Sequence, residues 1–234
     1  MSVTENIALL HERITAAAKR SHRNPDEITL MAVSKTFPPE LIRGAYAAGL
    51  RVFGESRVQE FSGKIESLKE LSDAEWHMIG HLQTNKAAKA VELFNAVDSL
   101  DSLRLAEKLN AAAEQSGKQL PALIEINVGG EEAKTGISAD SQELEDILQA
   151  APRWKNLKIR GLMTVPPYTD DPEGARPFFR KLRALRGQIA GRNLSDVSMD
   201  VLSMGMSHDF EVAIEEGSTF VRVGTAIFGE RTLY

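Results

Sequence analysis

The sequence predicts an α/β fold, a single (β/α)8 TIM barrel built as one domain over residues 1–234. Eight short apolar or β-rich segments follow one another along the chain, and helical patterns separate most of them. Strands that alternate with helices favour parallel βαβ units. Eight such strands in a chain of 234 residues fit a closed barrel better than an open doubly wound sheet. With 42% hydrophobic residues, the chain can bury one substantial core.

An extra helix is predicted ahead of the barrel, over residues 4–20. There Ile7, Leu10 and Ile14 recur at helical spacing, and Thr4 can cap the amino end. The eight predicted strands cover residues 28–35, 51–54, 76–80, 94–97, 122–128, 159–165, 201–204 and 220–228. Helices are predicted over residues 39–48, 59–71, 102–115, 141–150, 174–190 and 210–216, and several end at a glycine or before a proline. The turn around residues 85–89 can itself begin a helix.

Composition and charge exclude several classes of function. The net charge of −5 argues against a general nucleic-acid binder or a binder of anionic membranes. No cysteine is present, which excludes disulfides and thiolate metal sites and fits a cytoplasmic protein. We find no secretory signal and no apolar run near the ~20 residues of a membrane-spanning helix. His77 and His81 lie four residues apart, but Gly80 ends a strand between them, so we expect no metal site.

Lys35 is the first candidate for chemistry, because it ends a nearly apolar run. Burial disfavours the charged ammonium ion and makes the neutral amine available as a nucleophile, which Schiff-base chemistry requires. The alternative interpretation is a lysine at a strand end whose charge simply reaches water.

An anion-binding segment is predicted near the other end of the chain. Arg222 interrupts an apolar strand and needs an acceptor or a ligand to offset its burial. Gly224 and Thr225 come next, and a glycine backbone with a threonine hydroxyl can bind phosphate at the last βα loop of a barrel. Ser203 and Ser207, around the end of the preceding strand, can form a second wall of the same anion-binding site. A reactive lysine together with a phosphate site suggests a ligand with an aldehyde and a phosphate, such as pyridoxal 5'-phosphate (PLP).

The functional site of a barrel forms at the carboxyl ends of its strands. Chemically distinctive residues are predicted at those ends: Lys35, Glu55, Ser56, His77, Asn127, Met163, Thr164, Ser203, Ser207, Arg222, Gly224 and Thr225. We expect them to line one shared pocket that binds the cofactor.

Seven motifs carry a family resemblance. They read AVSKT at 32–36, FGESRVQE at 53–60, WHMIGHLQTNK at 76–86, KTG at 134–136, RGLM at 160–163, LSMGMS at 202–207 and VRVGTAIFG at 221–229. In this order they closely resemble the small pyridoxal-phosphate-binding homeostasis proteins of the YggS/PROSC type, also labelled alanine racemase N-terminal-like. The whole series is far more specific than any one motif.

The resemblance implies a fold like the barrel domain of alanine racemase, with PLP held as an internal aldimine on Lys35. It also implies that Gly224, Thr225 and Ser207, with Ser203, surround the phosphate, and that Arg222 faces the pyridine nitrogen. One position departs from the family pattern. Ser56 stands where asparagine is usual, so a shorter hydroxyl replaces an amide that would approach the cofactor.

A non-catalytic role in PLP homeostasis is therefore expected, with effects on amino-acid and keto-acid balance. An arginine beside the pyridine nitrogen discourages its protonation and makes the ring a poorer electron sink. Racemases with such an arginine add a second base from another domain, for which we expect no room before Tyr234. We expect a cytoplasmic monomer whose partners are PLP and PLP-dependent apoenzymes, with no nucleic acid and no membrane.

Three alternatives remain open on the sequence. The first is a PLP-dependent amino-acid racemase, with Lys35 as one base and a tyrosine or His77 as the other. The second is an aldolase that forms a Schiff base with sugar phosphates. The third is an interaction module that takes no small ligand.

Overall fold

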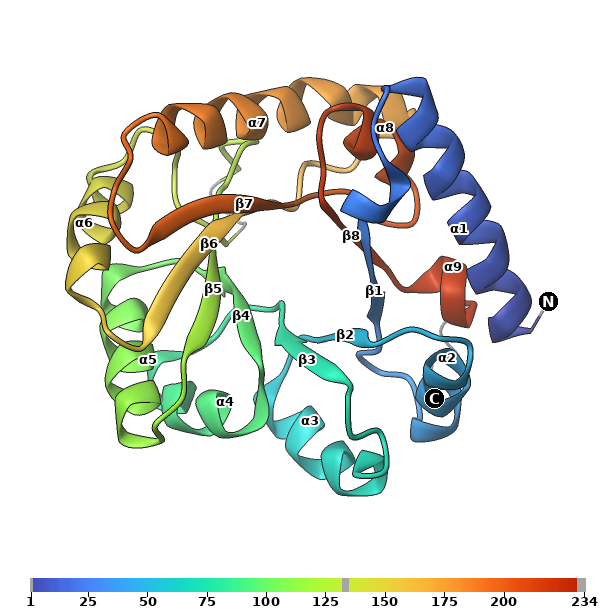
Figure 1. The fold of residues 1–234 in the computed structure, drawn as a ribbon, viewed down its shortest axis with the longest axis horizontal. Coiled ribbons are helices and arrows are strands. Elements are labelled where there is room, and N and C mark those ends of the chain that lie inside the picture. Colours follow the sequence, from blue (N-terminus) through green and yellow to red (C-terminus); the bar gives the residue numbers. More distant parts are fainter. Residues whose placement is uncertain (1, 132–134, 231–234) are drawn as a thin grey trace.

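Eight parallel strands close into a barrel in the order in which they follow along the chain (Figure 1). The computed structural model describes residues 2–131 and 135–230. The strands are β1 (Thr29–Val33), β2 (Val52–Glu55), β3 (Glu75–Met78), β4 (Ala96–Leu100), β5 (Leu120–Glu125), β6 (Leu157–Met163), β7 (Val197–Ser203) and β8 (Phe220–Val223). The pairing of β1 with β8, in which Met31 lies opposite Arg222, completes the ring. The predicted (β/α)8 barrel is confirmed.

Helices alternate with the strands and cover the outside of the barrel (Figure 1). They are α1 (Val3–Arg20), α2 (Pro39–Ala47), α3 (Val58–Lys64), α4 (Ala87–Leu93), α5 (Leu103–Gln115), α6 (Gln142–Ala150), α7 (Arg176–Ala190), α8 (Phe210–Glu215) and α9 (Thr225–Phe228). Short 3-10 turns are η1 (Pro25–Glu27), η2 (Ile65–Leu68), η3 (Thr84–Lys86), η4 (Ala151–Arg153) and η5 (Pro172–Ala175). Aromatic rings of Phe53, Trp76, Phe61 and Phe94 pack in series, with centroids 4.8 to 5.0 Å apart. This packing joins β2 and β3 to α3 and to the end of α4.

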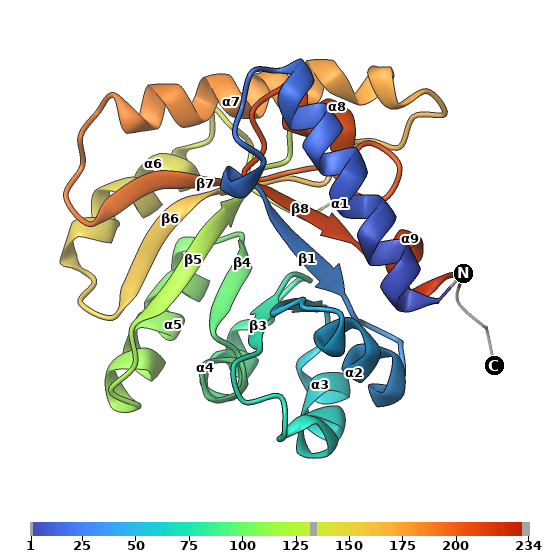
Figure 2. The same ribbon diagram turned by 45° about the vertical axis from the view of Figure 1, so that its right-hand side comes forward.

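The extra amino-terminal helix is confirmed as α1, which lies on the outside of the barrel beside α8 and α9 (Figure 2). Its cap is Ser2 and not the predicted Thr4. The Ser2 hydroxyl accepts from the Glu5 N–H, while the Glu5 carboxylate accepts from the Ser2 N–H, so the two residues form a capping box. Asn6 Nδ2 then donates to the carbonyl oxygen of Ile227 at 2.9 Å and ties α1 to α9.

Several predicted boundaries were wrong. The strand predicted over 220–228 ends at Val223, because Gly224 turns out of the extended conformation (φ −115°, ψ −75°) and caps α9. The strand predicted over 94–97 is β4, which runs to Leu100 and therefore contains Asp98. The helix predicted over 59–71 divides into α3 and η2, and β7 begins before the predicted 201. The turn around residues 85–89 does begin a helix, through η3 into α4.

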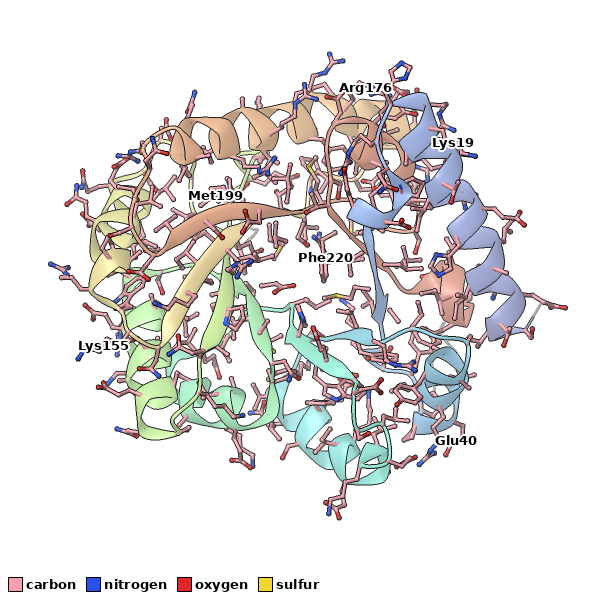
Figure 3. The ribbon with its side chains drawn as sticks, in the orientation of Figure 1. Lys19, Glu40, Lys155, Arg176, Met199 and Phe220 are labelled. Atoms are coloured by element: carbon pink, nitrogen blue, oxygen red, sulfur yellow. The ribbon has the colours of Figure 1, made fainter. Side chains whose placement is uncertain are left out.

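A cavity lies at the amino end of the barrel, opposite the end that carries the βα loops. At the amino end, a cavity of about 210 Å³ is lined by Glu75 and Phe220, which begin their strands, and by His77 and Asp98. Figure 3 shows Phe220 inside the ring of strands, whereas the labelled Lys155 lies outside it. At the carboxyl end lie the loops that follow the strands.

In the described part of the chain, we find no helix with the length and apolar character needed to cross a membrane.

Candidate functional site

Lys35 lies two residues beyond β1, at the carboxyl end of the barrel, where it is partly buried. Because β1 pairs with both β2 and β8, the loop that carries Lys35 leaves the barrel beside the ends of these two strands. Gly224 follows β8 at this edge. A Cβ atom added to Gly224 would lie 3.3 Å from the carbonyl oxygen of Val33. The fold therefore brings the predicted lysine and the predicted phosphate segment to neighbouring strand ends.

Arg222 points into the barrel and is only 4% exposed. Its Nη1 donates to Ser203 Oγ at 2.6 Å, and its Nη2 donates to the carbonyl oxygen of Thr164 at 2.7 Å. Burial lowers the pKa of the guanidinium, and nearby carboxylates oppose that shift. These carboxylates belong to Asp98, Asp209 and Glu125. The end of β7 and the residue after β6 thus fix the direction of the guanidinium, and acidic neighbours balance its charge.

Ser207, Gly224 and Thr225 lie together at the start of α9. The N–H of Ala226 donates to Ser207 Oγ at 3.4 Å, which places the serine against the first turn of this helix. The N–H groups of Ile227 and Phe228 already donate to the Gly224 carbonyl oxygen at 2.9 Å. The earlier N–H groups, at Thr225 and Ala226, have no acceptor within the helix. Together with two hydroxyls they make a donor set that suits a phosphate.

Gly205 sets the course of the loop that carries Ser207. Its φ is +93°, and an added Cβ would lie 2.6 Å from the Cβ of Ala213, so the position requires glycine. The Gly205 carbonyl oxygen accepts from the Arg222 backbone N–H at 3.0 Å. The loop after β7 is therefore fixed to β8.

Ser203 has a different environment from the one expected of a phosphate contact. It is fully buried at the end of β7, and its hydroxyl accepts from Arg222. This geometry favours a part in orienting the guanidinium.

His77 does not lie at the carboxyl end, and that expectation was wrong. It is within β3 and lines the amino-end cavity. Its Nδ1 lies 3.1 Å from both carboxylate oxygens of Asp98, and its ring stacks on Phe220 with centroids 5.5 Å apart. Burial alone would lower the pKa of His77, but Asp98 and Glu75 together raise it to about 9. His77 is therefore an imidazolium at neutral pH, on the side of the barrel away from Lys35.

Three further predicted residues lie at or after strand ends. Asn127 holds its own loop, because its Oδ1 accepts from the N–H of residue 130 at 3.0 Å and its Nδ2 donates to the carbonyl of residue 131 at 2.9 Å. Met163 is the buried last residue of β6, and Ser56 directly follows β2 and is partly buried. Lys134, in one of the resemblance motifs, and Tyr234 lie outside the described residues.

The sequence did not indicate several polar groups near these residues: the buried Ser34 and Asp98, and the partly buried Glu60 and Lys64. Asp98 had a detectable signal, since an acidic residue interrupts the apolar run at 96–100. Glu60 and Lys64 had only the i, i+4 spacing of an ordinary surface pair. Across the described residues, no cluster of three or more histidine, aspartate or glutamate side chains could hold a metal ion.

Nearly the whole chain is similar to one known family of proteins. A family model described as alanine racemase, N-terminal domain, matches residues 6–232. The chain belongs to this family. A pyridoxal phosphate homeostasis protein of Aquifex aeolicus is 47% identical over 231 residues, which are 99% of each chain. The protein of that name in Escherichia coli K12 is 42% identical over 231 residues, covering 98% of this chain and 97% of the relative.

Two solved structures are similar to this chain over most of its length. PipY of Synechococcus elongatus, solved with PLP bound, is 35% identical and superposes with a TM-score of 0.84, over 97% of this chain and 100% of PipY. An alanine racemase of Corynebacterium glutamicum is 18% identical, with a TM-score of 0.71, over 97% of this chain and 62% of the racemase. The latter likeness is one of fold. The family expected from the sequence motifs is confirmed.

Proposed function

We propose that this protein binds PLP through a covalent link to Lys35 and serves PLP homeostasis by carrying or buffering the cofactor. The observation that carries this proposal is the close approach of Gly224 to the end of β1, directly beside the loop of Lys35. An amine and a phosphate-binding segment at neighbouring strand ends suit a ligand that has both an aldehyde and a phosphate. The names of the relatives, and the PLP bound in PipY, support the same ligand.

The residues present fit PLP. Ser207, Gly224 and Thr225 would hold the phosphate, and Arg222 would face the pyridine nitrogen from within the barrel. Ser203 would direct Arg222, with which it shares a 2.6 Å hydrogen bond. When bound, PLP supplies an aldehyde that a lysine amine can capture and a ring that draws electrons from attached groups. Ser56, Asn127 and Met163 would border the cofactor from neighbouring strand ends.

A carrier role is supported more strongly than catalysis. A buried cationic arginine opposite the ring nitrogen disfavours protonation of that nitrogen, which weakens electron withdrawal from a bound amino acid. The relatives are named for homeostasis and not for turnover. The natural recipients of a carried cofactor are PLP-dependent apoenzymes, to which this protein would deliver PLP as a monomer. The absence of cysteine supports a cytoplasmic place for this function.

Amino-acid racemisation is the second candidate, favoured by the description of the family model. An assay of L-alanine conversion to D-alanine with PLP-loaded protein separates the two. Turnover that disappears in Lys35→Ala would support a racemase, whereas bound PLP without turnover supports a carrier.

The visible absorption spectrum of purified protein tests PLP binding. We expect an absorption band from PLP joined to lysine, present in the wild type and lost in Lys35→Ala. Lys155→Ala, at an exposed lysine outside the barrel, is the matched control and should keep the band. A band that survives Lys35→Ala, or a wild-type protein that takes up no PLP, would refute the proposal.

A further inference from the structure

The residues on both sides of Lys35 are held by side chains from β2 and α3. On one side, Ser34 is fully buried, and its Oγ donates to Glu55 Oε1 at 2.7 Å. On the other side, the N–H of Thr36 donates to Glu60 Oε1 at 2.6 Å. Two carboxylates thus hold the residue before Lys35 and the residue after it.

Lys64 joins these two carboxylates. Its Nζ lies 3.0 Å from Glu55 Oε1, 3.3 Å from Glu60 Oε1 and 3.2 Å from the carbonyl oxygen of Ser34. An ammonium group has three N–H donors, and here three oxygens are placed to accept them. The Lys64 side chain is only 10% exposed, so water competes little for these contacts. Lys64 is therefore a largely buried structural cation directly beside the Lys35 loop.

Thr36 shows why this loop needs to be held. Its φ is +67°, in the left-handed region that β-branched residues rarely adopt. Without an external contact, the chain would relax toward negative φ, and the preceding peptide with Lys35 would turn with it. The hydrogen bond to Glu60 opposes that relaxation. Glycine would adopt the same φ without steric cost.

We propose that Lys64, by bridging Glu55 and Glu60, acts as a positioning residue that fixes the direction in which the Lys35 amine meets PLP. This inference rests on the proposed function, since it concerns how that site is prepared for its ligand. Loading joins the Lys35 nitrogen to the aldehyde carbon of PLP and releases one water molecule. Its rate depends on how often the amine points toward the aldehyde, so loss of the clamp slows loading even in a folded protein.

The test is the rate of PLP loading, followed by the growth of visible absorbance after PLP-free protein is mixed with PLP. Lys64→Met with Glu55→Gln removes the bridge without leaving a buried unpaired charge. Burial already raises the pKa of Glu55 against the pull of Lys64, so a neutral side chain is tolerated there. We expect this double variant to load about tenfold more slowly. The control is Lys69→Met, at an exposed lysine paired with Glu66, which should load at the wild-type rate.

A second pair of variants separates positioning from general stability. Glu60→Ala should also slow loading about tenfold, because it releases Thr36. Adding Thr36→Gly should then recover about half of that loss on a logarithmic scale, because glycine keeps the positive φ without help. Denaturant unfolding of the same proteins is the accompanying readout. A merely structural role for Glu60 would make the loading rate follow the fraction of folded protein, whereas positioning slows loading in protein that is fully folded.

The outcomes are distinct. Equal loading rates in the wild type and both slow variants would overturn the positioning inference and leave the proposed function standing. Slow loading by Glu60→Ala that Thr36→Gly does not correct would also overturn it. A wild-type protein that takes up no PLP would refute the proposed function itself.

Discussion

His77 and Asp98 form a largely buried ion pair inside the amino end of the barrel, with Nδ1 3.1 Å from both carboxylate oxygens. Asp98 is almost completely buried and also interacts electrostatically with Arg222. One carboxylate therefore balances two cations, one facing the amino-end cavity and one directed by the carboxyl-end residues Ser203 and Thr164.

Because of this ion pair, we expect the folded protein to lose stability at alkaline pH. The pKa of His77 is raised from 6.5 to about 9 in the folded protein, so the protonated form stabilises the fold. This contribution is complete below about pH 6.5 and is lost as the pH rises through 9. We expect the free energy of unfolding in denaturant to fall by about 3 kcal/mol between pH 6 and pH 10. His77→Asn should flatten this dependence, and an equally steep curve in that variant would contradict the assignment.

Arg222→Gln should destabilise the protein by about 3 kcal/mol, because it leaves Asp98, Asp209 and Glu125 without their shared cation. Arg160→Gln removes an exposed arginine paired with Asp200 and should change stability by less than about 1 kcal/mol. Denaturant unfolding at pH 7 measures both. Similar stabilities of the two variants would show that the buried arginine does not balance those acids.

Gly205→Ala should destabilise the fold by about 2 kcal/mol or more, since alanine meets both a positive φ and a contact of 2.6 Å with Ala213. Gly187→Ala is the control, at an exposed position in the last turn of α7 with open space around the added carbon. That change should raise stability by up to about 1 kcal/mol. Thermal unfolding distinguishes the two, and a neutral Gly205→Ala would argue against the tight turn after β7.

The ionised carboxylate of Glu216 stabilises the folded protein at neutral pH, and this stabilisation is lost in acid. Burial would raise the pKa of this carboxyl, but Arg176, Arg180 and Arg183 outweigh burial and hold it below its usual range. Its stabilisation is therefore present above about pH 4.5 and is lost as the pH falls through the folded-state pKa. We expect Glu216→Gln to cost about 2 kcal/mol at pH 7, less than a fully buried pair because two of the arginines are well exposed.

The check is the difference in unfolding free energy between the wild type and Glu216→Gln at several pH values. This difference should shrink below pH 4.5. Glu92→Gln, in an exposed pair with Lys89, should differ from the wild type by less than about 1 kcal/mol throughout. A gap for Glu216→Gln that is unchanged at pH 3 would contradict the ionic origin of the effect.

The sequence predicted the barrel because alternation of strands and helices is a local pattern that tolerates boundary errors. It also indicated Lys35 and Gly224, because each breaks or ends an apolar run. The end of the barrel at which His77 lies could not be predicted from such a pattern. Strands in a barrel are staggered, so a residue late in one strand can lie level with a residue that begins another, as His77 does with Phe220.

The surroundings of Lys35 were also beyond the sequence. Lys64 contacts the carbonyl oxygen of Ser34 only because the fold brings α3 to the end of β1. No local pattern in the sequence predicts that contact. The i, i+4 pair of Glu60 and Lys64 resembles many solvent-exposed pairs. The turn at Gly224 was missed because residues 225–228 are mostly apolar and suit a strand as well as a helix.

Peptide mass mapping after borohydride reduction of the PLP-loaded protein is the most direct measurement. Reduction makes a lysine–PLP linkage permanent, so the modified peptide names the residue. The added mass of PLP should lie on the peptide that contains Lys35 and on that residue. Modification at another lysine, or none at all in protein that shows the visible band, would contradict a cofactor link at the end of β1.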